Sequence, residues 1–505
     1  MLVSKKLHAH GYAGKFVRID LTNEKTYVGE TSRELVIKYL GGTGFCTKIL
    51  WDEVNEKTNP LGPENKLIFA TGPVTGTLFP PAGRYVIASK SPLTGIWGES
   101  HSGGHFGPEL KFAGFDYFII QGRSRTPVYI SIRNEEIEIK DAKQLWGKDT
   151  FETTKMIKEM EDDKETMVAC IGQAGENLVK YACVINDIDK SARAAGRTGM
   201  GTVMGSKNLK AIGIVGSRDV TIADPETFLE VVEEAMDKCT KGEWGEAAEE
   251  SLGKYGTPNL VNAMNEIGRL PTKNHWTGVY NDCEEIGPQT IRNKYRIGRG
   301  ACFQCPIACK YSSSITTGPY AGTLTGGPEY ESVVAFGSNC LNPNIGSIVY
   351  ANMLCNLYGM DTISCGKTIS WAMECFENNL LSKKEADNID LSWGNEETII
   401  ALIHKIAKRQ GLGKLLAEGV KKASVKLGRG SAKYAMHVKG LEISGQDGRS
   451  HKSIGLTHAI GVRGADHLRS LCTVDELGYR DIAAERFGKD SVNDICDLLS
   501  ENKKA

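Results

Sequence analysis

Three cysteines in one short stretch are the residues of this sequence best suited to metal chemistry. Cys302, Cys305 and Cys309 follow C-x2-C-x3-C spacing, and Pro306 comes directly after the second cysteine. Thiolates spaced this closely on a loop can point into one small volume, where soft sulfur ligands select an iron–sulfur cluster or zinc. Zinc sites typically use paired couplets, whereas this run supplies three ligands together. The spacing therefore favours a [4Fe–4S] cluster with a fourth ligand from elsewhere, over the alternative of three buried thiols.

The composition is that of a globular protein with room for more than one core. The 505 residues are 40% hydrophobic and 24% charged, with a formal net charge of -1. This balance argues against nucleic acid as a partner. No apolar stretch reaches the roughly 20 residues of a membrane span, and the start lacks the apolar core of a signal peptide. We therefore expect a cytoplasmic protein with no membrane partner, whose 14 cysteines are ligands or buried thiols rather than disulfides.

Glycine is abundant and gathers in loops that also carry cations and other polar side chains. The sequence holds 57 glycines, above the usual share of about 7%. Two such stretches are 82–110, which carries Arg84, His101, Ser102 and His105, and 191–207, which carries Arg193 and Arg197. The second stretch matches neither the P-loop nor the dinucleotide-binding spacing. Its backbone N–H groups and guanidinium groups still suit a phosphate or another polyanion, with ordinary surface turns as the alternative.

The pattern along the first part of the chain predicts strands joined by glycine-rich turns. Residues 15–21 alternate between apolar and polar side chains and predict a strand, with 25–28 as its hairpin partner. The stretch 41–44 predicts the opening of a helix that runs through Leu50. Residues 209–215 predict a strand that closes this β-rich domain near residue 216.

The remainder predicts helices, so the fold class is α+β. Asp224 and Pro225 form a helix start, with Asp as N-cap and Pro in the first turn. Further helices are predicted over 353–375 and over 398–426, the latter interrupted at Gly411. The predicted domains are a β-rich domain at 1–216, a helical domain with the cysteine loop at 217–425, and a C-terminal helical domain at 426–505.

A series of motifs, in this order and over essentially the whole chain, resembles the tungsten-containing aldehyde ferredoxin oxidoreductase family. Each glycine motif alone is weak, but the set together is specific. The motifs are Arg84 with Ser89-Lys90-Ser91-Pro92-Leu93-Thr94-Gly95, Ser102-Gly103-Gly104, Arg193-Ala194-Ala195-Gly196-Arg197, the three cysteines, Gly327-Pro328-Glu329-Tyr330-Glu331, Gly359-Met360-Asp361-Thr362-Ile363-Ser364, and Arg463-Gly464-Ala465-Asp466-His467.

The resemblance implies a set of cofactors. It implies a tungsten-bis(pterin) centre, or tungstopterin, whose phosphates are bridged by Mg2+, beside a [4Fe–4S] cluster on Cys302, Cys305 and Cys309. Arg84 would lie between the cluster and the pterin, which suits the fixed fork of donors of a guanidinium. The other cofactor-binding residues that it implies are His101, Ser102, Gly103, Gly104, Arg193, Ala194, Ala195, Gly196, Arg197, Asn356, Gly359, Asp361 and Asp466.

The resemblance also implies the reaction and its partners. An aldehyde would be oxidised to a carboxylic acid, with a glutamate and His467 as proton acceptor and donor. Glu331 is slightly preferred over Glu329 for this role. The electrons would pass one at a time through the cluster to ferredoxin. A homo-oligomer is expected, with electron-transfer subunits as further partners.

The C-terminal end departs from the family pattern. By the family's spacing, the fourth cluster cysteine would fall just past Ala505. We therefore expect a truncated C-terminal domain, a substitute ligand in Cys472 or Cys496, or a labile cluster with three cysteine ligands.

Two other functions stay open. The stretch 438–449, with Gln446, also resembles the tungsten subunit of the benzoyl-CoA reductases, in which Cys340 would be a tungsten ligand rather than a buried thiol. The departure at the C-terminal end suggests a second alternative, a non-catalytic subunit that keeps the fold to carry a cluster.

Overall fold

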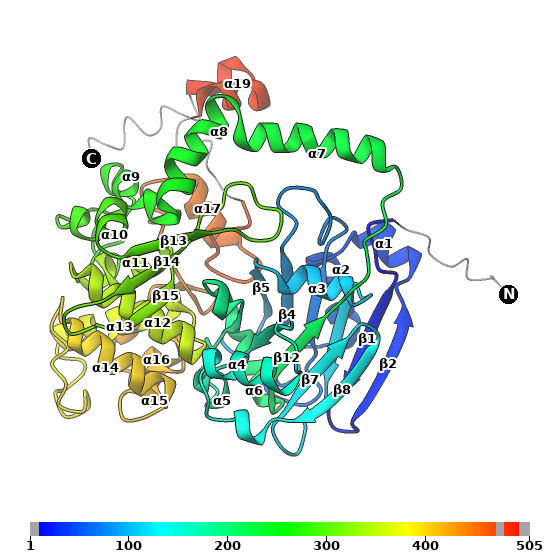
Figure 1. Cartoon of the computed structure of the whole chain (residues 1–505). Coiled ribbons are helices and arrows are strands. Elements are labelled where there is room, and N and C mark those ends of the chain that lie inside the picture. Colours follow the sequence, from blue (N-terminus) through cyan, green and yellow to red (C-terminus); the bar gives the residue numbers. More distant parts are fainter. Residues whose placement is uncertain (1–9, 471–478, 494–505) are drawn as a thin grey trace.

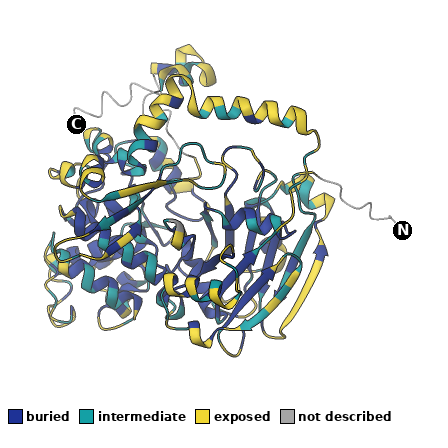
Figure 2. Cartoon of the chain, in the orientation of Figure 1, coloured by how far each residue is buried: buried dark blue, intermediate teal, exposed yellow. Residues whose placement is uncertain are grey.

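The computed structural model describes residues 10–470 and 479–493. The N-terminal part, blue to cyan in Figure 1, is built on two β-sheets, and the green-to-yellow part is mainly helical. This arrangement confirms the predicted α+β class. Helix α7 (Pro225–Thr240) runs along one side of the molecule and is exposed over most of its length (Figure 2). It begins as predicted, because the Asp224 side chain accepts from the backbone N–H of Thr227.

The first sheet has six strands in the order β2-β1-β6-β3-β4-β5. The predicted hairpin is confirmed: β1 and β2 pair antiparallel, with Asp20 opposite Lys25. Val17 and Ile19 of β1 are buried while Arg18 between them is half-buried, as the alternation predicts. The strands are β1 (Lys15–Asp20), β2 (Lys25–Glu30), β3 (Leu67–Thr71), β4 (Tyr85–Lys90), β5 (Trp97–Ser102) and β6 (Tyr117–Gln121).

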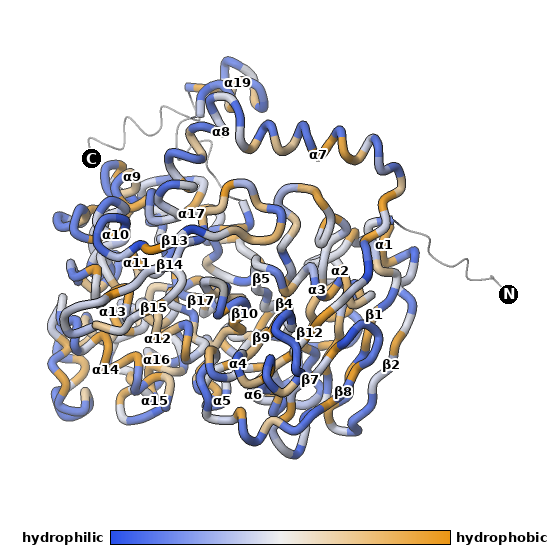
Figure 3. The backbone as a smooth tube through the Cα atoms, in the orientation of Figure 1, coloured by the Kyte–Doolittle hydropathy of each residue, from blue (hydrophilic) through white to orange (hydrophobic). Residues whose placement is uncertain are grey.

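The second sheet, also six-stranded, has the order β11-β10-β9-β12-β7-β8. One hydrophobic cluster joins side chains of both sheets, including Phe69 and Phe118 from the first and Ile130 and Ile212 from the second. The inner strands β9 and β12 are largely hydrophobic (Figure 3). The predicted strand at 209–215 is confirmed as β12. The strands are β7 (Val128–Arg133), β8 (Glu136–Asp141), β9 (Met167–Cys170), β10 (Val184–Asn186), β11 (Arg193–Ala195) and β12 (Leu209–Val215).

In the part of the chain that the structure describes, six α-helices accompany these sheets. The helix predicted after 41–44 is confirmed as α2, whose Phe45 and Ile49 pack against β3 and β4 in a separate hydrophobic cluster. The helices are α1 (Arg33–Tyr39), α2 (Thr43–Glu53), α3 (Phe106–Phe112), α4 (Thr150–Met160), α5 (Gln173–Glu176) and α6 (Met200–Ser206).

A buried ion pair ties the start of the described chain to the first sheet. Lys111 of α3 and Asp116 lie 2.8 Å apart (Nζ to Oδ1), and neither side chain has exposed surface. Asp116 also accepts from the backbone N–H groups of Ala13 and Gly14 and from the hydroxyl of Thr31. Burial lowers the pKa of Lys111, against the opposing effect of Asp116. Removing either partner would therefore leave the other charge buried without a counter-ion, which destabilises the fold.

Lys111→Met is expected to destabilise the protein by about 3–5 kcal/mol, because it leaves the Asp116 carboxylate buried without its counter-ion. The measurement is the free energy of unfolding in urea. Lys38→Met is the matched control: Lys38 is exposed and pairs with Glu34 at i,i+4, so its loss should cost only about 0.2–0.5 kcal/mol. Equal, small effects of the two substitutions would contradict the role of the buried pair.

The helical part corrects two sequence predictions. The helix predicted over 353–375 is two helices, α12 and α13, because Gly359 adopts the left-handed conformation (φ 69°) at the end of α12 and Asp361 caps α13. The stretch 398–426 holds three helices rather than a pair broken at Gly411. The helices of this part are α8 (Gly242–Ala248), α9 (Leu260–Glu266), α10 (Pro288–Lys294), α11 (Tyr330–Phe336), α12 (Ile345–Tyr358), α13 (Thr362–Glu377), α14 (Glu396–Ala407), α15 (Gly413–Leu416) and α16 (Val420–Leu427).

A three-stranded sheet within the helical part carries the cysteine loop. Its strands, in the order β13-β14-β15, are β13 (Arg296–Gly300), β14 (Lys310–Ile315) and β15 (Thr323–Gly326). The loop at 301–309 joins the antiparallel strands β13 and β14. This short connection keeps the three cysteines within one hairpin.

The described part of 426–505 combines short helices with a small hairpin. Its elements are β16 (His437–Val438), β17 (Leu441–Glu442), α17 (Lys452–Ile460) and α19 (Arg480–Phe487). No helix of the described residues is long and apolar enough to cross a membrane.

Candidate functional site

A cavity of about 410 Å3 brings together segments that are far apart in the sequence. Its walls come from the two N-terminal sheets, the cysteine loop, the start of α11, the turn between α12 and α13, and the segment after α17. The predicted site residues that line it are Arg84, His101, Ser102, Gly103, Arg193, Ala194, Gly196, Arg197, Cys302, Cys305, Cys309, Glu329, Glu331, Asn356, Asp361 and His467.

Four predicted site residues are not in the cavity wall but support it. The Gly104 carbonyl accepts from the backbone N–H of Phe303, which holds the cysteine loop against the first sheet. Ala195 is buried in β11, and Gly359 ends α12. Asp466 accepts two bonds from Arg463 (2.8 and 2.6 Å). These residues position their neighbours instead of facing the cavity.

The cysteine loop is docked tightly onto the N-terminal part. The backbone N–H of Ala82 donates to the Phe303 carbonyl (3.3 Å), next to the bond that Phe303 donates to Gly104. Ala308 adopts the left-handed conformation (φ 46°), which turns the chain just before Cys309. A Cβ added to Gly103 would lie 2.9 Å from Sγ of Cys302. Glycine at 103 therefore makes room for the first thiol.

Gly103→Ala is accordingly expected to displace Cys302 and to lower the bound iron per chain severalfold, since a Cβ contact of 2.9 Å requires a shift of the sulfur. Iron analysis of anaerobically purified protein measures this effect. Gly298→Ala serves as the control, because nothing lies within 4 Å of a Cβ at Gly298. Full iron content in Gly103→Ala would show that this close approach is unimportant.

The surroundings of Cys309 favour the protonated form of its thiol. Burial and then the charge of Glu329 raise the pKa of Cys309 to about 11, against the opposing effect of Arg193. Metal binding would therefore release a proton from this thiol. Among the described residues, no group of three or more His, Cys, Asp or Glu side chains is placed to hold a metal ion. The ligand role of the three cysteines rests on their spacing and on their common place in the cavity wall.

The two glutamates of the predicted catalytic motif have different environments. Glu329 accepts from Nη1 of Arg193 (2.6 Å) and from the hydroxyl of Thr257 (2.5 Å). Burial opposes its ionisation, but Arg193 and Thr257 lower the pKa of Glu329 below its ordinary value. Both oxygens of this carboxylate are thus engaged by protein donors.

Glu331, in contrast, lies beside His467. Oε1 of Glu331 is 3.6 Å from Nε2 of His467, and its two oxygens accept from the side-chain amide of Gln446 (2.6 Å) and the backbone N–H of Gly445 (2.7 Å). Burial opposes ionisation, but His467 and these two donors lower the pKa of Glu331. Burial also lowers the pKa of His467, helped by Arg197 and opposed by Glu331. An ionised carboxylate and a neutral imidazole, each able to accept a proton, therefore lie next to each other here.

Some residues that sequence reasoning missed organise the predicted phosphate loop. Asn186 accepts from the Ser102 hydroxyl (2.6 Å) and donates to the Gly103 carbonyl (3.0 Å). Asp187 accepts from the backbone N–H and, at 2.8 Å, faces Nδ1 of His105. The Ser102 hydroxyl is thus used within the protein. In the sequence, the one indication of this role is that two polar residues, Asn186 and Asp187, directly follow the apolar stretch 182–185. This indication is weak without knowledge of the fold.

Two predicted cofactor-binding side chains at the turn between α12 and α13 also form hydrogen bonds within the protein. The Asn356 amide donates to the hydroxyl of Thr325 (3.1 Å). Asp361 accepts from the backbone N–H groups of Ile363 and Ser364 as the cap of α13. Both residues line the cavity, but their side chains are partly occupied by structural bonds.

Some polar atoms at the cavity have no hydrogen-bond partner among the described residues and fit a bound polar group, although Nε of Arg197 lies 3.7 Å from Oδ2 of Asp361. Nε of Arg197 and Nδ1 of His467 are buried without a hydrogen-bond partner among the described residues. Arg84 is exposed and lines the cavity, and its guanidinium group has no hydrogen bond or ion pair with another described residue. These donors, together with three thiols, match the needs of an anionic cofactor and an iron–sulfur cluster. Cys472 and Cys496 lie outside the described residues.

Family models for aldehyde ferredoxin oxidoreductases match both parts of this chain. The model of the N-terminal domain matches residues 16–216, and the model of domains 2 & 3 matches residues 230–502. The chain therefore belongs to the aldehyde ferredoxin oxidoreductase family, which confirms the resemblance seen in its motifs.

Individual relatives agree with this assignment. The tungsten-containing aldehyde ferredoxin oxidoreductase of Pyrococcus furiosus is 43% identical over 472 residues, which is 93% of this chain and 76% of the relative. The protein of the same description from Thermococcus kodakarensis has the same identity and coverage. Membership of this tungsten-containing family implies a tungstopterin and an iron–sulfur cluster.

A solved structure shares the architecture. It is the active site complex BamBC of benzoyl coenzyme A reductase in complex with 1,5-dienoyl-CoA. The similarity has a TM-score of 0.76 at 27% identity and covers 86% of this chain and 66% of that chain.

Proposed function

We propose that this chain oxidises aldehydes to carboxylic acids and passes the electrons through a [4Fe–4S] cluster to ferredoxin. The observation that carries the proposal is that the Glu331–His467 pair lines the same cavity as Cys302, Cys305 and Cys309. The 43% identity to tungsten-containing aldehyde ferredoxin oxidoreductases supports the choice of reaction.

The residues of the cavity divide into three roles. The cysteines would hold the cluster, and Arg84 and Arg197 would donate to the tungstopterin, with Mg2+ held by backbone carbonyls of 101–104 and 193–196. When bound, the tungstopterin supplies a centre that accepts two electrons. The Arg193–Glu329 ion pair would keep this wall rigid, since both partners are bonded to each other and lie beside the cysteine loop.

The proton chemistry falls to Glu331 and His467. Oxidation of an aldehyde with water to a carboxylate releases two electrons and three protons, so a proton acceptor is needed beside the substrate. Glu331 is held ionised by Gln446 and Gly445 and can accept a proton. Neutral His467, with its Nδ1 unpartnered, can take or return a proton at the same place.

Metal analysis and turnover test this proposal together. Protein purified without oxygen is expected to hold about one tungsten and four iron atoms per chain and to reduce a viologen dye with an aldehyde. Iron without tungsten or molybdenum, and no turnover with a panel of aldehydes, would contradict it and favour a non-catalytic cluster carrier.

A second candidate is a tungsten subunit that acts on an aromatic acyl-CoA with partner subunits. The similarity to the benzoyl coenzyme A reductase complex supports it. Cys340 supports it less: the thiol is fully buried, donates to the Ala335 carbonyl at 3.3 Å and is not in the cavity wall. Turnover of an aromatic acyl-CoA, with no aldehyde oxidation, would favour this candidate.

A further inference from the structure

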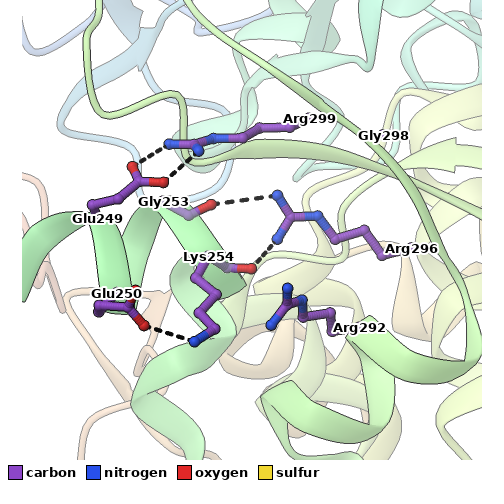
Figure 4. A pocket seen from close by; sticks show the side chains of 8 residues that line it. All are labelled: Glu249, Glu250, Gly253, Lys254, Arg292, Arg296, Gly298 and Arg299. Carbon is purple, nitrogen blue, oxygen red and sulfur yellow. Dashed lines mark hydrogen bonds and ion pairs between the residues drawn. The ribbon is translucent and has the colours of Figure 1, made fainter.

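A second pocket lies on the surface next to the cysteine loop. It has a volume of about 500 Å3 and is formed by the chain after α8, by α10 and by β13 (Figure 4). Its lining is almost entirely charged, and the residues that line it are Glu249, Glu250, Gly253, Lys254, Arg292, Arg296, Gly298 and Arg299.

The charged side chains that line this pocket give it a net positive charge. Glu249 forms a bidentate ion pair with Arg299 (2.6 and 2.5 Å), and Glu250 pairs with Lys254 (2.6 Å). The remaining two cations, Arg292 and Arg296, have no carboxylate within ion-pairing distance among the described residues. The pocket therefore carries two positive charges that no carboxylate of the described residues balances, on exposed Arg292 and half-buried Arg296.

Aromatic rings hold the two unpaired guanidinium groups in place. Arg292 lies over the ring of Tyr255 (5.5 Å to the centroid), and Arg296 lies over Tyr311 (5.2 Å). Arg296 also donates to the Lys254 and Gly253 carbonyls. Arg292 is exposed, and no hydrogen bond or ion pair reaches it in Figure 4. Its charge is thus ordered and accessible.

The pocket is linked directly to the cysteines. The Arg299 guanidinium donates to the Ala308 carbonyl (Nε, 3.0 Å) and to the Ile307 carbonyl (Nη2, 2.8 Å), just before Cys309. The loop reaches the surface here, since Gln304 is exposed and Cys305 is half-buried. A partner seated on the pocket would therefore lie beside the cysteine loop, and neither Glu331 nor His467 lines this pocket.

We infer that this pocket is the docking surface for an acidic iron–sulfur electron carrier. The inference rests on the proposed function, because it assigns the place at which electrons leave the cysteine loop. Carboxylates of the carrier would pair with Arg292 and Arg296, and the positive charge would speed association and set orientation.

The test compares Arg292→Glu with the wild type, using an acidic ferredoxin and a viologen dye as alternative acceptors for aldehyde oxidation. Arg292→Glu is expected to raise the KM for ferredoxin at least about tenfold, to weaken its dependence on salt, and to leave the viologen-dependent rate unchanged. Arg33→Glu is the matched control, because Arg33 is also exposed but lies on α1, on the opposite side of the molecule from α10 and β13 in Figure 1.

Direct binding of the ferredoxin, measured by calorimetry, separates this inference from the proposed function. If no aldehyde is oxidised but Arg292→Glu still weakens binding at least about tenfold, the docking surface stands while the reaction fails. If both variants bind ferredoxin like the wild type, or weaken it equally, the docking surface is overturned whatever the turnover.

Discussion

Cys302→Ser is expected to remove most of the iron from the protein and to abolish aldehyde-dependent reduction of viologen. A serine hydroxyl is a harder and far less acidic ligand than a thiol, so it does not replace a cluster thiolate. Loss of a contact that only supports a metal ligand typically costs about 10–100-fold in affinity or activity. Loss of the ligand itself should exceed that range. Iron analysis and the electron paramagnetic resonance spectrum of the reduced protein are the measurements.

Cys239→Ser is the control for this experiment. Cys239 is a partly exposed thiol on α7 and is not in the cavity wall, so its substitution should leave the iron content unchanged. If Cys302→Ser keeps about four iron atoms per chain, the cysteine loop does not hold the cluster. If both substitutions lower iron equally, general instability rather than ligand loss is the cause.

The local patterns of this sequence predicted its elements well where neighbouring residues decide the structure. The alternation in 15–21 depends only on which side chains face the core, and β1 follows it. Asp224 and Pro225 act within one helical turn, and α7 starts there. The merged prediction over 353–375 failed because apolar periodicity continues through Gly359, although the left-handed residue reverses the chain.

The cavity could be predicted only through the motifs that resemble a known family. Those motifs indicated the cysteines, Glu331 and His467, and the fold brings them into one wall. Thr257 and Gln446 were missed as partners of the two glutamates because each lies more than 70 residues from its carboxylate. Such pairs depend on tertiary packing, which the local periodicity of a sequence does not reveal.

The same long-range packing explains why two glutamates only two residues apart have different environments. Glu329 precedes the first turn of α11 and meets Arg193 and Thr257, whereas Glu331 lies inside the helix and faces the segment after β17. The motif alone left their order open. The neighbours, rather than the motif, favour Glu331 as the proton acceptor.

Glu331→Gln should therefore lower kcat by about 100–10,000-fold, the range for loss of a general base, with tungsten and iron content unchanged. The amide keeps the size of the side chain and removes the charge. Glu329→Gln is the matched comparison: it weakens the bond to Arg193 but leaves the proton acceptor in place, so its effect on kcat should be much smaller. The reverse order of effects would assign the base to Glu329.

The pH profile gives an independent check of the same assignment. Because the pKa of Glu331 lies below its ordinary value of 4.5 and that of His467 below 6.5, the active form, with ionised Glu331 and neutral His467, persists at pH 7. The wild-type kcat/KM is therefore expected to fall only on the acid side, below pH 6.5. In Glu331→Gln, the carboxylate that raises the pKa of His467 is gone. The pH below which the residual kcat/KM falls should therefore be lower than in the wild type. If kcat/KM of Glu331→Gln falls at the same pH as that of the wild type, the charge of Glu331 does not influence the titration of His467.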